Sequence, residues 1–394
     1  MDNVNLEQQF ELAFGRQKGI IRSFCPYRIC PLGAHVDHQH GLVTGFALDK
    51  GVEMFYVPTD DGRVEIVSLN YDGKVAFDLH EELERTFSWG DFTKGAARIL
   101  SEKYRLRRGF KAVIYGALPT GGLSSSAAVI ITYLLAFCKV NEIMLTQAQL
   151  IRYAIRVERE FIGVNVGKLD QSCEVYCRKD KLLYLDTLDD TTELVSIPDN
   201  MPDFSFAIVF SGVERKLAGS AYNSRVDECK AASYALKGYA GMEYGRFSDS
   251  YLRDVPREIF EEYRDRLPKN WRKRAFHFYE ENERVKQGVK AWREGDLVRF
   301  GQLIRESGHS SIYEYETGSE ELKALYEILC DCEGVYGGRF SGAGFNGCSM
   351  AIVDPEKEQH IAEYVEQEYL KRFPHLRDSF AVYFCHSADG VSIL

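Results

Sequence analysis

The spacing of apolar and polar residues in the first half of the chain predicts strands mixed with helices. Extended runs rich in β-branched and aromatic residues are expected at residues 20–29, 42–57, 64–69 and 110–115. Asp-Gly turns that end at Gly62 and Gly73 punctuate these runs, which favours antiparallel pairing. Apolar residues recur with helical spacing at residues 92–104, 124–140 and 146–161.

A strand-like apolar run at residues 204–210 opens the second half, and a long, charged, helical region follows at residues 220–304. A glycine-rich segment at residues 334–347 interrupts the pattern. A strand at 348–353, a helix at 355–369 and a strand at 380–386 are expected after it. This order predicts an α+β protein. A connector containing Pro198 and Pro202 puts the boundary near Asp199, so the expected domains are residues 1–199 and 200–394.

Composition narrows the classes of partner. The 394 residues are 45% hydrophobic and 27% charged, as in ordinary soluble proteins, and a net charge of −10 argues against a nucleic-acid partner. The chain opens without a basic, then apolar, leader, and its longest apolar stretch, residues 127–138, is too short to cross a bilayer. Ten scattered cysteines suggest reduced thiols. We expect a cytoplasmic protein without a membrane partner; no protein partner is indicated.

The strongest local signal is a run of glycines and serines at residues 118–128, between an expected strand and an apolar helix. Glycines let the backbone approach a ligand closely, and the start of a helix favours phosphate. The run is not a Walker A loop, because no Gly-Lys-Ser/Thr ends it. A flexible loop with a serine helix cap explains the same residues equally well.

A second segment, residues 26–41, gathers Arg28, Asp37 and three histidines after a strand-like start. Such a cluster is suited to hydrogen bonding a polyhydroxylated ligand. The spacing of His35, Asp37 and His38 is also a weak hint of a metal site, although no second cluster completes it. Proline, glycine and polar residues are equally typical of a solvated turn, and the residues alone slightly favour that interpretation.

A third segment, residues 337–348, contains Gly342, Gly344 and Gly347 with the spacing of a dinucleotide-binding fingerprint. A Rossmann site needs a helix directly after the glycines, and here a strand-like run follows, so that interpretation is rejected. Two others remain open: a glycine-rich wall against a phosphate or sugar, and a tight hairpin between two strands.

Together the three segments resemble, in the same order, the three motifs of the GHMP kinases, and in detail those of the galactokinase branch. The resemblance continues between them. Residues 89–95 are similar to the family's Trp-x-x-Tyr-x-x-Gly, and residues 158–171 to its Glu-His-x-Phe…Gly-Ile-Met-Asp-Gln run. Tyr222 with Arg225, and Arg274 with His277, also match. Nearly the whole chain is covered.

This resemblance implies a two-domain GHMP kinase fold. The N-terminal domain would resemble domain 2 of ribosomal protein S5, and the C-terminal domain would contain a ferredoxin-like element. ATP and a sugar would meet in the cleft between the domains. The implied reaction moves the γ-phosphate of ATP to the sugar's anomeric hydroxyl, with Mg²⁺ as the metal.

The resemblance also implies roles for individual residues. Asp170 would be the general base, and Arg28 would keep it ionised and stabilise the transferring phosphoryl group. Ser126 and Glu158 match the family's Mg²⁺ ligands. The expected ATP contacts are Trp89, Gly121, Gly122, Leu123, Ser124, Ser125 and Ser126. The expected sugar contacts are Ala34, His35, Asp37, Gly167, Lys168 and Tyr222. Without the resemblance, Asp170 could be an ordinary helix N-terminal residue and Glu158 a surface residue.

Ala34 departs from the galactokinase pattern, which has a glutamate that binds the sugar's C6 hydroxyl at this position. The residues of the first and third motifs are instead similar to those of galacturonokinases, which phosphorylate D-galacturonate at C1. A glutamate roughly 4 Å from a C6 carboxylate would cost about 4 kcal/mol at an effective dielectric constant of about 20. Ala34 removes that repulsion. Candidates to meet the carboxylate are Tyr27, His38, Lys168, Tyr222 and Arg225.

Two alternatives to a kinase specific for galacturonate stay open. Ala34 is also consistent with drift at a loop position in a galactokinase that acts on galactose. A non-catalytic sugar sensor, as found among galactokinase relatives, is the second alternative. Damage to the serine loop or loss of the base is the usual sign of such a sensor. Both features are intact here, which favours an enzyme.

Overall fold

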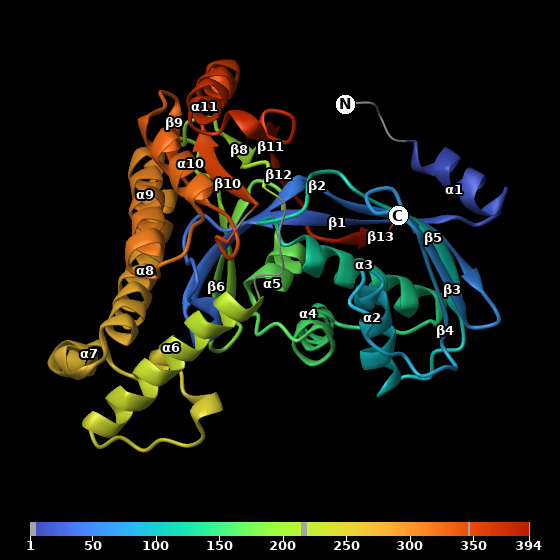
Figure 1. Ribbon diagram of the computed structural model, residues 1–394, viewed down its shortest axis with the longest axis horizontal. Coiled ribbons are helices and arrows are strands. Elements are labelled where there is room, and N and C mark those ends of the chain that lie inside the picture. The colour runs from blue at the N-terminus through green and yellow to red at the C-terminus, as the bar shows by residue number, and fades with distance from the viewer. Residues whose placement is uncertain (1–4, 214–218, 346, 394) are drawn as a thin grey trace.

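The computed structural model describes residues 5–213, 219–345 and 347–393, and two β-sheets organise them (Figure 1). The larger sheet has the order β13-β1-β2-β5-β3-β4, with β6 and β12 also on β2 and β7 on β6. Its strands are β1 (Ile21–Ile29), β2 (Leu42–Thr59), β3 (Arg63–Ser68), β4 (Lys74–Asp78), β5 (Gly109–Gly116), β6 (Lys181–Asp186), β7 (Thr192–Ser196), β12 (Ser387–Ala388) and β13 (Ser392–Ile393). The smaller sheet, β11-β8-β10-β9, contains β8 (Ser205–Phe210), β9 (Val335–Phe340), β10 (Cys348–Val353) and β11 (Ala381–Cys385).

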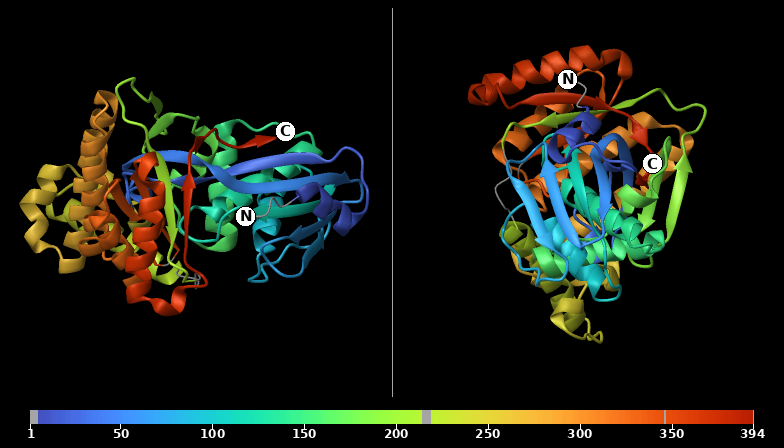
Figure 2. Two further views of the ribbon diagram at one scale, coloured as in Figure 1. Left: turned by 90° about the horizontal axis from the view of Figure 1, so that it is seen from above. Right: turned by 90° about the vertical axis from the view of Figure 1, so that its right-hand side faces the viewer.

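Helices cover the larger sheet mainly on one face, as Figures 1 and 2 show. These are α2 (Asp91–Ser101), α3 (Ser125–Val140), α4 (Gln147–Arg156) and α5 (Leu169–Tyr176). Along β2 the side chains alternate between two cores, as strand geometry requires. Tyr56 belongs to the main core with α3, whereas the next residue, Val57, packs with Phe10 of α1 (Leu6–Phe14).

The second half of the chain is mainly helical around the smaller sheet. Its helices are α6 (Gly219–Tyr239), α7 (Arg257–Tyr263), α8 (Lys269–Glu294), α9 (Leu297–Tyr313), α10 (Glu320–Asp331) and α11 (Glu358–Arg372). Trp292 of α8 packs against Phe46 of β2, with 5.4 Å between ring centroids, and against Phe300 of α9, at 5.1 Å. The two halves therefore share one hydrophobic core.

Several expected elements differ in detail. The helical region expected at 220–304 is divided into α6 to α9, and Pro256 and Pro268 stand directly before α7 and α8. Proline lacks the N–H group that a helix interior needs, so it favours helix starts. The helix expected at 146–161 becomes a π-helix at Val157–Ile162. Strand β9 lies within the glycine-rich segment, for which a hairpin between two strands was one of the two open interpretations. Short 3₁₀ turns lie at Asp37–Gln39, Phe247–Asp249, Leu252–Asp254, Arg264–Arg266, Pro355–Lys357 and Pro374–Leu376.

The end of the chain returns to the larger sheet. Strand β12 pairs with β2, and β13 pairs with β1. A division into residues 1–199 and 200–394 therefore leaves the last two strands on the sheet of the first half. Among the helices of the described residues, none combines the length and apolar character that crossing a membrane requires.

Candidate active site

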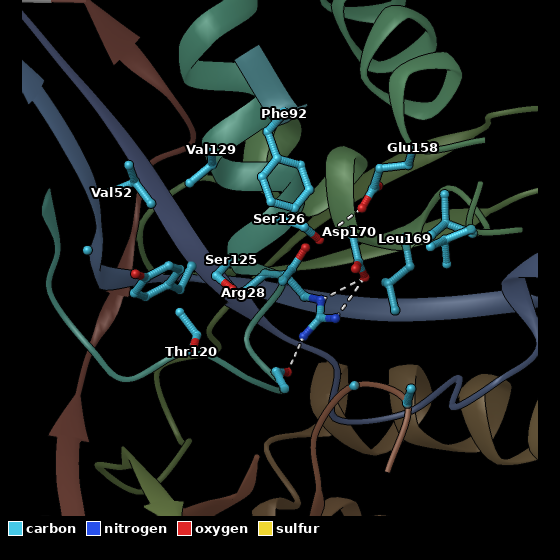
Figure 3. A pocket seen from close by; sticks show the side chains of 18 of the residues that line it. Arg28, Val52, Phe92, Thr120, Ser125, Ser126, Val129, Glu158, Leu169 and Asp170 are labelled. Atoms are coloured by element: carbon cyan, nitrogen blue, oxygen red, sulfur yellow. Dashed lines mark hydrogen bonds and ion pairs between the residues drawn. The ribbon is translucent and has the colours of Figure 1, made fainter. Parts of the chain in front are cut away.

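A cavity of about 410 Å³ lies where the start of α3, the start of α5, the loop after β1 and the β9–β10 turn meet (Figure 3). Three groups of residues line it. The aromatic end includes Tyr27, Tyr71, Trp89, Phe92 and Tyr133. The glycine end consists of Thr120, Gly122, Ser124, Ser125, Ser126, Gly342 and Ala343. The histidine end consists of Cys30, Ala34, His35, Asp37, Gly167, Tyr222 and Arg339.

The glycine end is built by backbone that turns sharply into α3. Gly121 and Gly122 have φ angles of +123° and +87°, and Ser124 takes the left-handed conformation at φ +65°. The Ser124 side chain forms no capping bond to α3. The first N–H groups of α3 and the hydroxyls of Ser125 and Ser126 are therefore arranged as in an anion-binding helix start.

The β9–β10 turn packs directly on this loop. A Cβ on Gly347 would lie 2.6 Å from the carbonyl carbon of Gly121, so only glycine permits this backbone contact. The Ser341 hydroxyl donates a hydrogen bond to the Gly122 carbonyl over 2.6 Å. The third motif is thus a hairpin between two strands and also a wall behind the loop at residues 118–124 that precedes α3, here called the glycine–serine loop.

Arg28 and Asp170 form the ion pair at the centre of the cavity (Figure 3). Arg28 donates from Nε and Nη2 to Asp170 Oδ1, at 2.9 and 2.8 Å, and from Nη1 to the Gly122 carbonyl at 2.8 Å. Burial disfavours the charge on Arg28, but Asp170 outweighs it and raises the pKa of the guanidinium. An irregularity in the β1–β2 register between Pro26 and Arg28 re-aims the strand at this point. The pair therefore fixes the carboxylate beside the glycine–serine loop.

Ser126 and Glu158 face each other across the cavity wall. The Ser126 hydroxyl donates to Glu158 Oε1 over 2.8 Å, and Gln171 Nε2 donates to Glu158 Oε2. Glu158 is buried and belongs to the π-helix, a form that recurs at functional sites. Within the described residues, no group of three or more His, Cys, Asp or Glu is placed to hold a metal ion. The Ser126–Glu158 pair alone fits a cation whose other ligands come from a substrate.

At the histidine end, Asp37 and His35 are held in restrained positions. Leu169 N–H donates to Asp37 Oδ2 over 3.2 Å, and a Cβ on Gly167 would lie 1.9 Å from the same oxygen. Burial, and then the charge of Asp170, raise the pKa of Asp37 to about 6. His35 has φ +58° and stacks on Tyr315 with 4.5 Å between ring centroids.

The backbone at Ala34 is fixed from behind by α8. The Gly33 and Ala34 N–H groups both donate to Glu281 Oε1, at 2.8 and 3.0 Å. His277 Nε2 lies 2.8 Å from the Ala34 carbonyl, and because a carbonyl only accepts, this nitrogen carries the proton. The segment expected to be either a ligand site or a solvated turn is thus buried, and Ala34 lies on the cavity wall.

Comparison with known proteins shows which family this chain belongs to. Residues 91–178 match the GHMP kinases N terminal domain, and residues 289–371 match the GHMP kinases C terminal region. A galacturonokinase from Arabidopsis thaliana is 37% identical, over 96% of this chain and 95% of its own length. A galactokinase from Staphylococcus carnosus is 31% identical, over 99% of each chain. The chain belongs to the GHMP kinase family.

The fold agrees with this assignment. The crystal structure of Lactococcus lactis galactokinase complexed with galactose matches with a TM-score of 0.89 and 28% identity, over 98% of both chains. The expected α+β, two-domain GHMP kinase fold is therefore confirmed. So are the resemblance to galacturonokinase and the expectation of an enzyme: the protein is a kinase, and GHMP kinases use ATP as the phosphate donor.

Most residues singled out from the sequence line this GHMP kinase cavity, but some do not. Gly121 and Leu123 stand behind its wall, and Leu123 is buried in the core. Lys168 Nζ pairs with Asp190 at 2.5 Å and is absent from the lining. Its placement as a sugar contact therefore finds no support in the geometry.

Two other candidates for a carboxylate partner have different neighbours. His38 Nε2 lies 2.9 Å from the Tyr315 hydroxyl, and Arg225 pairs with Glu228 at 3.3 Å. Neither lines the cavity. His35, Asp37 and His38 also point to different partners, so they do not form the metal cluster that their spacing hinted at.

Sequence reasoning missed parts of both outer ends of the cavity. At the aromatic end, Tyr71 stacks with Trp89 at 6.4 Å between ring centroids, and Phe92 faces the cavity (Figure 3). At the histidine end, Arg339 was overlooked although it stands inside the third motif. A positively charged residue among the glycines of that motif was the signal from which Arg339 could have been found.

Proposed function

We propose that this GHMP kinase transfers the γ-phosphoryl group of ATP to the anomeric hydroxyl of D-galacturonate. The observation that carries the proposal is Ala34 on the cavity wall, where galactokinases have a glutamate. A methyl group leaves room for the extra oxygen of a C6 carboxylate and brings no negative charge toward it. The 37% identity to the Arabidopsis galacturonokinase supports the same substrate.

In this reaction Asp170 accepts the proton of the C1 hydroxyl. The sugar oxygen then forms a bond to the γ-phosphorus, the bond from that phosphorus to the β–γ bridging oxygen breaks, and ADP leaves with the electron pair. Arg28 orients Asp170 through two contacts and carries positive charge beside the glycine–serine loop, where phosphoryl charge develops. Phosphoryl transfer depends chiefly on positioning and electrostatics, so this small set of residues is sufficient.

Ser126 and Glu158 would hold Mg²⁺. Their hydroxyl and carboxylate oxygens are the hard donors that this ion prefers, and they face each other at 2.8 Å beside the loop. When bound, Mg²⁺ neutralises charge on the ATP phosphates. The first turn of α3 and the hydroxyl of Ser125 would hold the phosphates themselves. The aromatic end, with Trp89, would receive the base of ATP.

Galactose is the alternative substrate, and the galactokinase relative at 31% identity is the observation in its favour. The two sugars differ at C6, so the choice depends on the histidine end alone. The sensor interpretation has less support, because Arg28, Asp170 and the glycine–serine loop converge on one cavity.

The test is ATP consumption by the purified protein with galacturonate, galactose, glucuronate and N-acetylgalactosamine in parallel. We expect the highest kcat/KM with galacturonate and a product phosphorylated at C1, identified by ³¹P NMR. Equal or better use of galactose would contradict the proposal and make the enzyme a galactokinase. If the protein consumes no ATP with any of the four sugars, the result would point to the sensor interpretation.

A further inference from the structure

Arg339, the last residue but one of β9, is a buried cation that pairs with no acidic side chain of the described residues. It is only 2% exposed. Its Nη1 donates a long hydrogen bond, 3.4 Å, to the Cys30 carbonyl, and its Nε finds no hydrogen-bond partner among the residues that the structure describes. Within the described residues no carboxylate lies at ion-pair distance from it. Buried arginines are normally paired, because an uncompensated charge in a protein interior is unfavourable.

Glu281, the acidic side chain whose charge acts on Arg339, is already committed to other partners. Glu281 Oε2 accepts from Arg284 Nε at 2.7 Å, and its Oε1 accepts from Ser307 at 2.6 Å and from the backbone of residues 33 and 34. Burial opposes the charge of Glu281, but Arg284 and then other positive groups hold its pKa at about 2. Glu281 therefore pairs with Arg284 and not with Arg339. Among the described residues, the charge of Arg339 is left without a carboxylate at ion-pair distance.

This charge borders the cavity. Arg339 lines the histidine end together with Cys30, Ala34 and His35. After burial, the charge of Arg339 is the next cause that lowers the pKa of His35, so the guanidinium acts on this end of the cavity. The other cation in the lining of the described chain is Arg28, which is neutralised by Asp170. A negative ligand group at the histidine end would therefore meet Arg339.

Ala34 explains why the partner is missing. A glutamate at this position, as in galactokinases, would bring a carboxylate to the same wall as Arg339 and could neutralise it from within the protein. With Ala34, the described part of the chain places no carboxylate at ion-pair distance from Arg339. The cavity then combines a free guanidinium with the space of a missing carboxylate, which matches the C6 carboxylate of a hexuronic acid in both charge and volume.

We propose that Arg339 binds the C6 carboxylate of the sugar acid and that Ala34 leaves this arginine unpaired for it. The inference rests on the proposed function and names the group that makes it specific. Ala34 removes the repulsion that a glutamate would exert on the C6 carboxylate, and Arg339 attracts that carboxylate. An arginine can offer two parallel N–H groups to a carboxylate, which fixes the orientation of the ring as well as its charge.

The first experiment measures KM for galacturonate and for galactose in the wild type, Arg339→Met and Arg339→Lys. Methionine keeps much of the volume without the buried charge, so the variant is expected to fold. We expect Arg339→Met to raise KM for galacturonate about 100-fold or more, because a desolvated charge loses its partner, and to change KM for galactose less than about threefold. Arg339→Lys should fall in between. As an independent readout, galacturonate without ATP should raise the Tm of wild type but not that of Arg339→Met.

A matched pair at the other residue separates charge from size. Ala34→Glu places a carboxylate at the wall and Ala34→Gln places a neutral side chain of nearly equal volume there. We expect the turnover of galacturonate by Ala34→Glu to be at least about tenfold lower than that by Ala34→Gln. We also expect Ala34→Glu to have the higher Tm, because Arg339 gains a partner. These two variants decide the question even if Arg339→Met fails to fold.

The outcomes separate the two proposals. If wild type prefers galactose, the proposed function fails, and this inference fails with it. If wild type prefers galacturonate but Arg339→Met weakens both sugars equally or neither, the function stands and Arg339 is not the carboxylate partner. Equal behaviour of Ala34→Glu and Ala34→Gln would likewise overturn the inference, because size alone would explain the loss.

Discussion

At the glycine end of the cavity the polypeptide backbone forms the wall, whereas at the histidine end side chains form it. The glycine end depends on contacts such as that between Gly121 and Gly347, which leave no space for a Cβ atom. The histidine end brings Asp37, Tyr222 and Arg339 together from the β1–β2 connection, α6 and β9. A backbone wall suits a phosphate chain that every member of a kinase family must bind. A wall of side chains can change with the sugar.

The largest expected effect is at the junction of the two ends. Asp170→Asn should keep the fold and ATP binding but reduce kcat by about 10²–10⁴, because the amide cannot take the proton of the sugar hydroxyl. Single-turnover rates and the Tm of the variant measure this. Asp190→Asn, which removes an exposed carboxylate paired with Lys168, is the control and should keep near-normal rates. Near-normal turnover of Asp170→Asn would remove it from the mechanism.

The second effect concerns metal at the glycine end. Activity should require Mg²⁺, and Glu158→Gln should raise the Mg²⁺ concentration for half-maximal rate about 10–100-fold, because a charged oxygen ligand is lost. Titration of Mg²⁺ at saturating ATP measures the change. The control is Glu160→Gln, which removes an exposed carboxylate of the same π-helix. Unchanged metal dependence, or full activity in excess chelator, would exclude the site.

A third change sharpens the contrast between the two ends. Gly347→Ala adds a Cβ against Gly121 at a φ of +106°, whereas Gly73→Ala has a similar φ of +86° and open space around it. Both introduce a backbone strain of about 1–3 kcal/mol. Only Gly347→Ala should also raise KM for ATP, by about tenfold, with KM for the sugar little changed. A rise in the sugar's KM instead would show that the two ends are not separable.

The smallest effect is on stability at the histidine end. Burial lowers the pKa of His277 from its usual value near 6.5 to about 4, so the unfolded chain binds a proton that the folded protein does not. His277 therefore contributes stability that is fully present above pH 6.5 and is lost as pH falls toward 4. At pH values below 4, the loss of this contribution lowers the free energy of unfolding by on the order of 3 kcal/mol.

The variant His277→Gln should flatten the fall in unfolding free energy between pH 6.5 and 4, as measured by urea denaturation at several pH values. It should also lower stability at neutral pH, since the bond to the Ala34 carbonyl is disturbed. The exposed His309→Gln of α9 is the control. An unchanged pH slope in His277→Gln would mean that other buried groups dominate the acid sensitivity.

The contrast between the two ends also explains what the sequence could predict. At the glycine end, the succession of a strand, a glycine turn and a helix start was predicted, because these are local features with local residue preferences. Arg28 and Asp170 lie 142 positions apart, and no local pattern joins them. Their pairing was expected only from the resemblance to a family with known motifs.

The histidine end could not be predicted in the same way. Lys168 looked suitable because it precedes Asp170 by two positions, but at the start of α5 its side chain points to Asp190 instead. The unpaired state of Arg339 depends on Glu281 of α8 being occupied by Arg284 and by the backbone of the first motif. Such a balance of charges is a property of the assembled fold, and no segment of sequence contains it.

A competition between two sugars tests most sharply whether the histidine end selects a sugar acid. Wild-type enzyme receives equal concentrations of galacturonate and galactose with limiting ATP, and the two sugar 1-phosphates are quantified, so their ratio gives the ratio of kcat/KM values. We predict that galacturonate 1-phosphate exceeds galactose 1-phosphate by about 100-fold, the value of one desolvated charge contact. An excess of galactose 1-phosphate, or equal amounts of both, would contradict selection of a sugar acid.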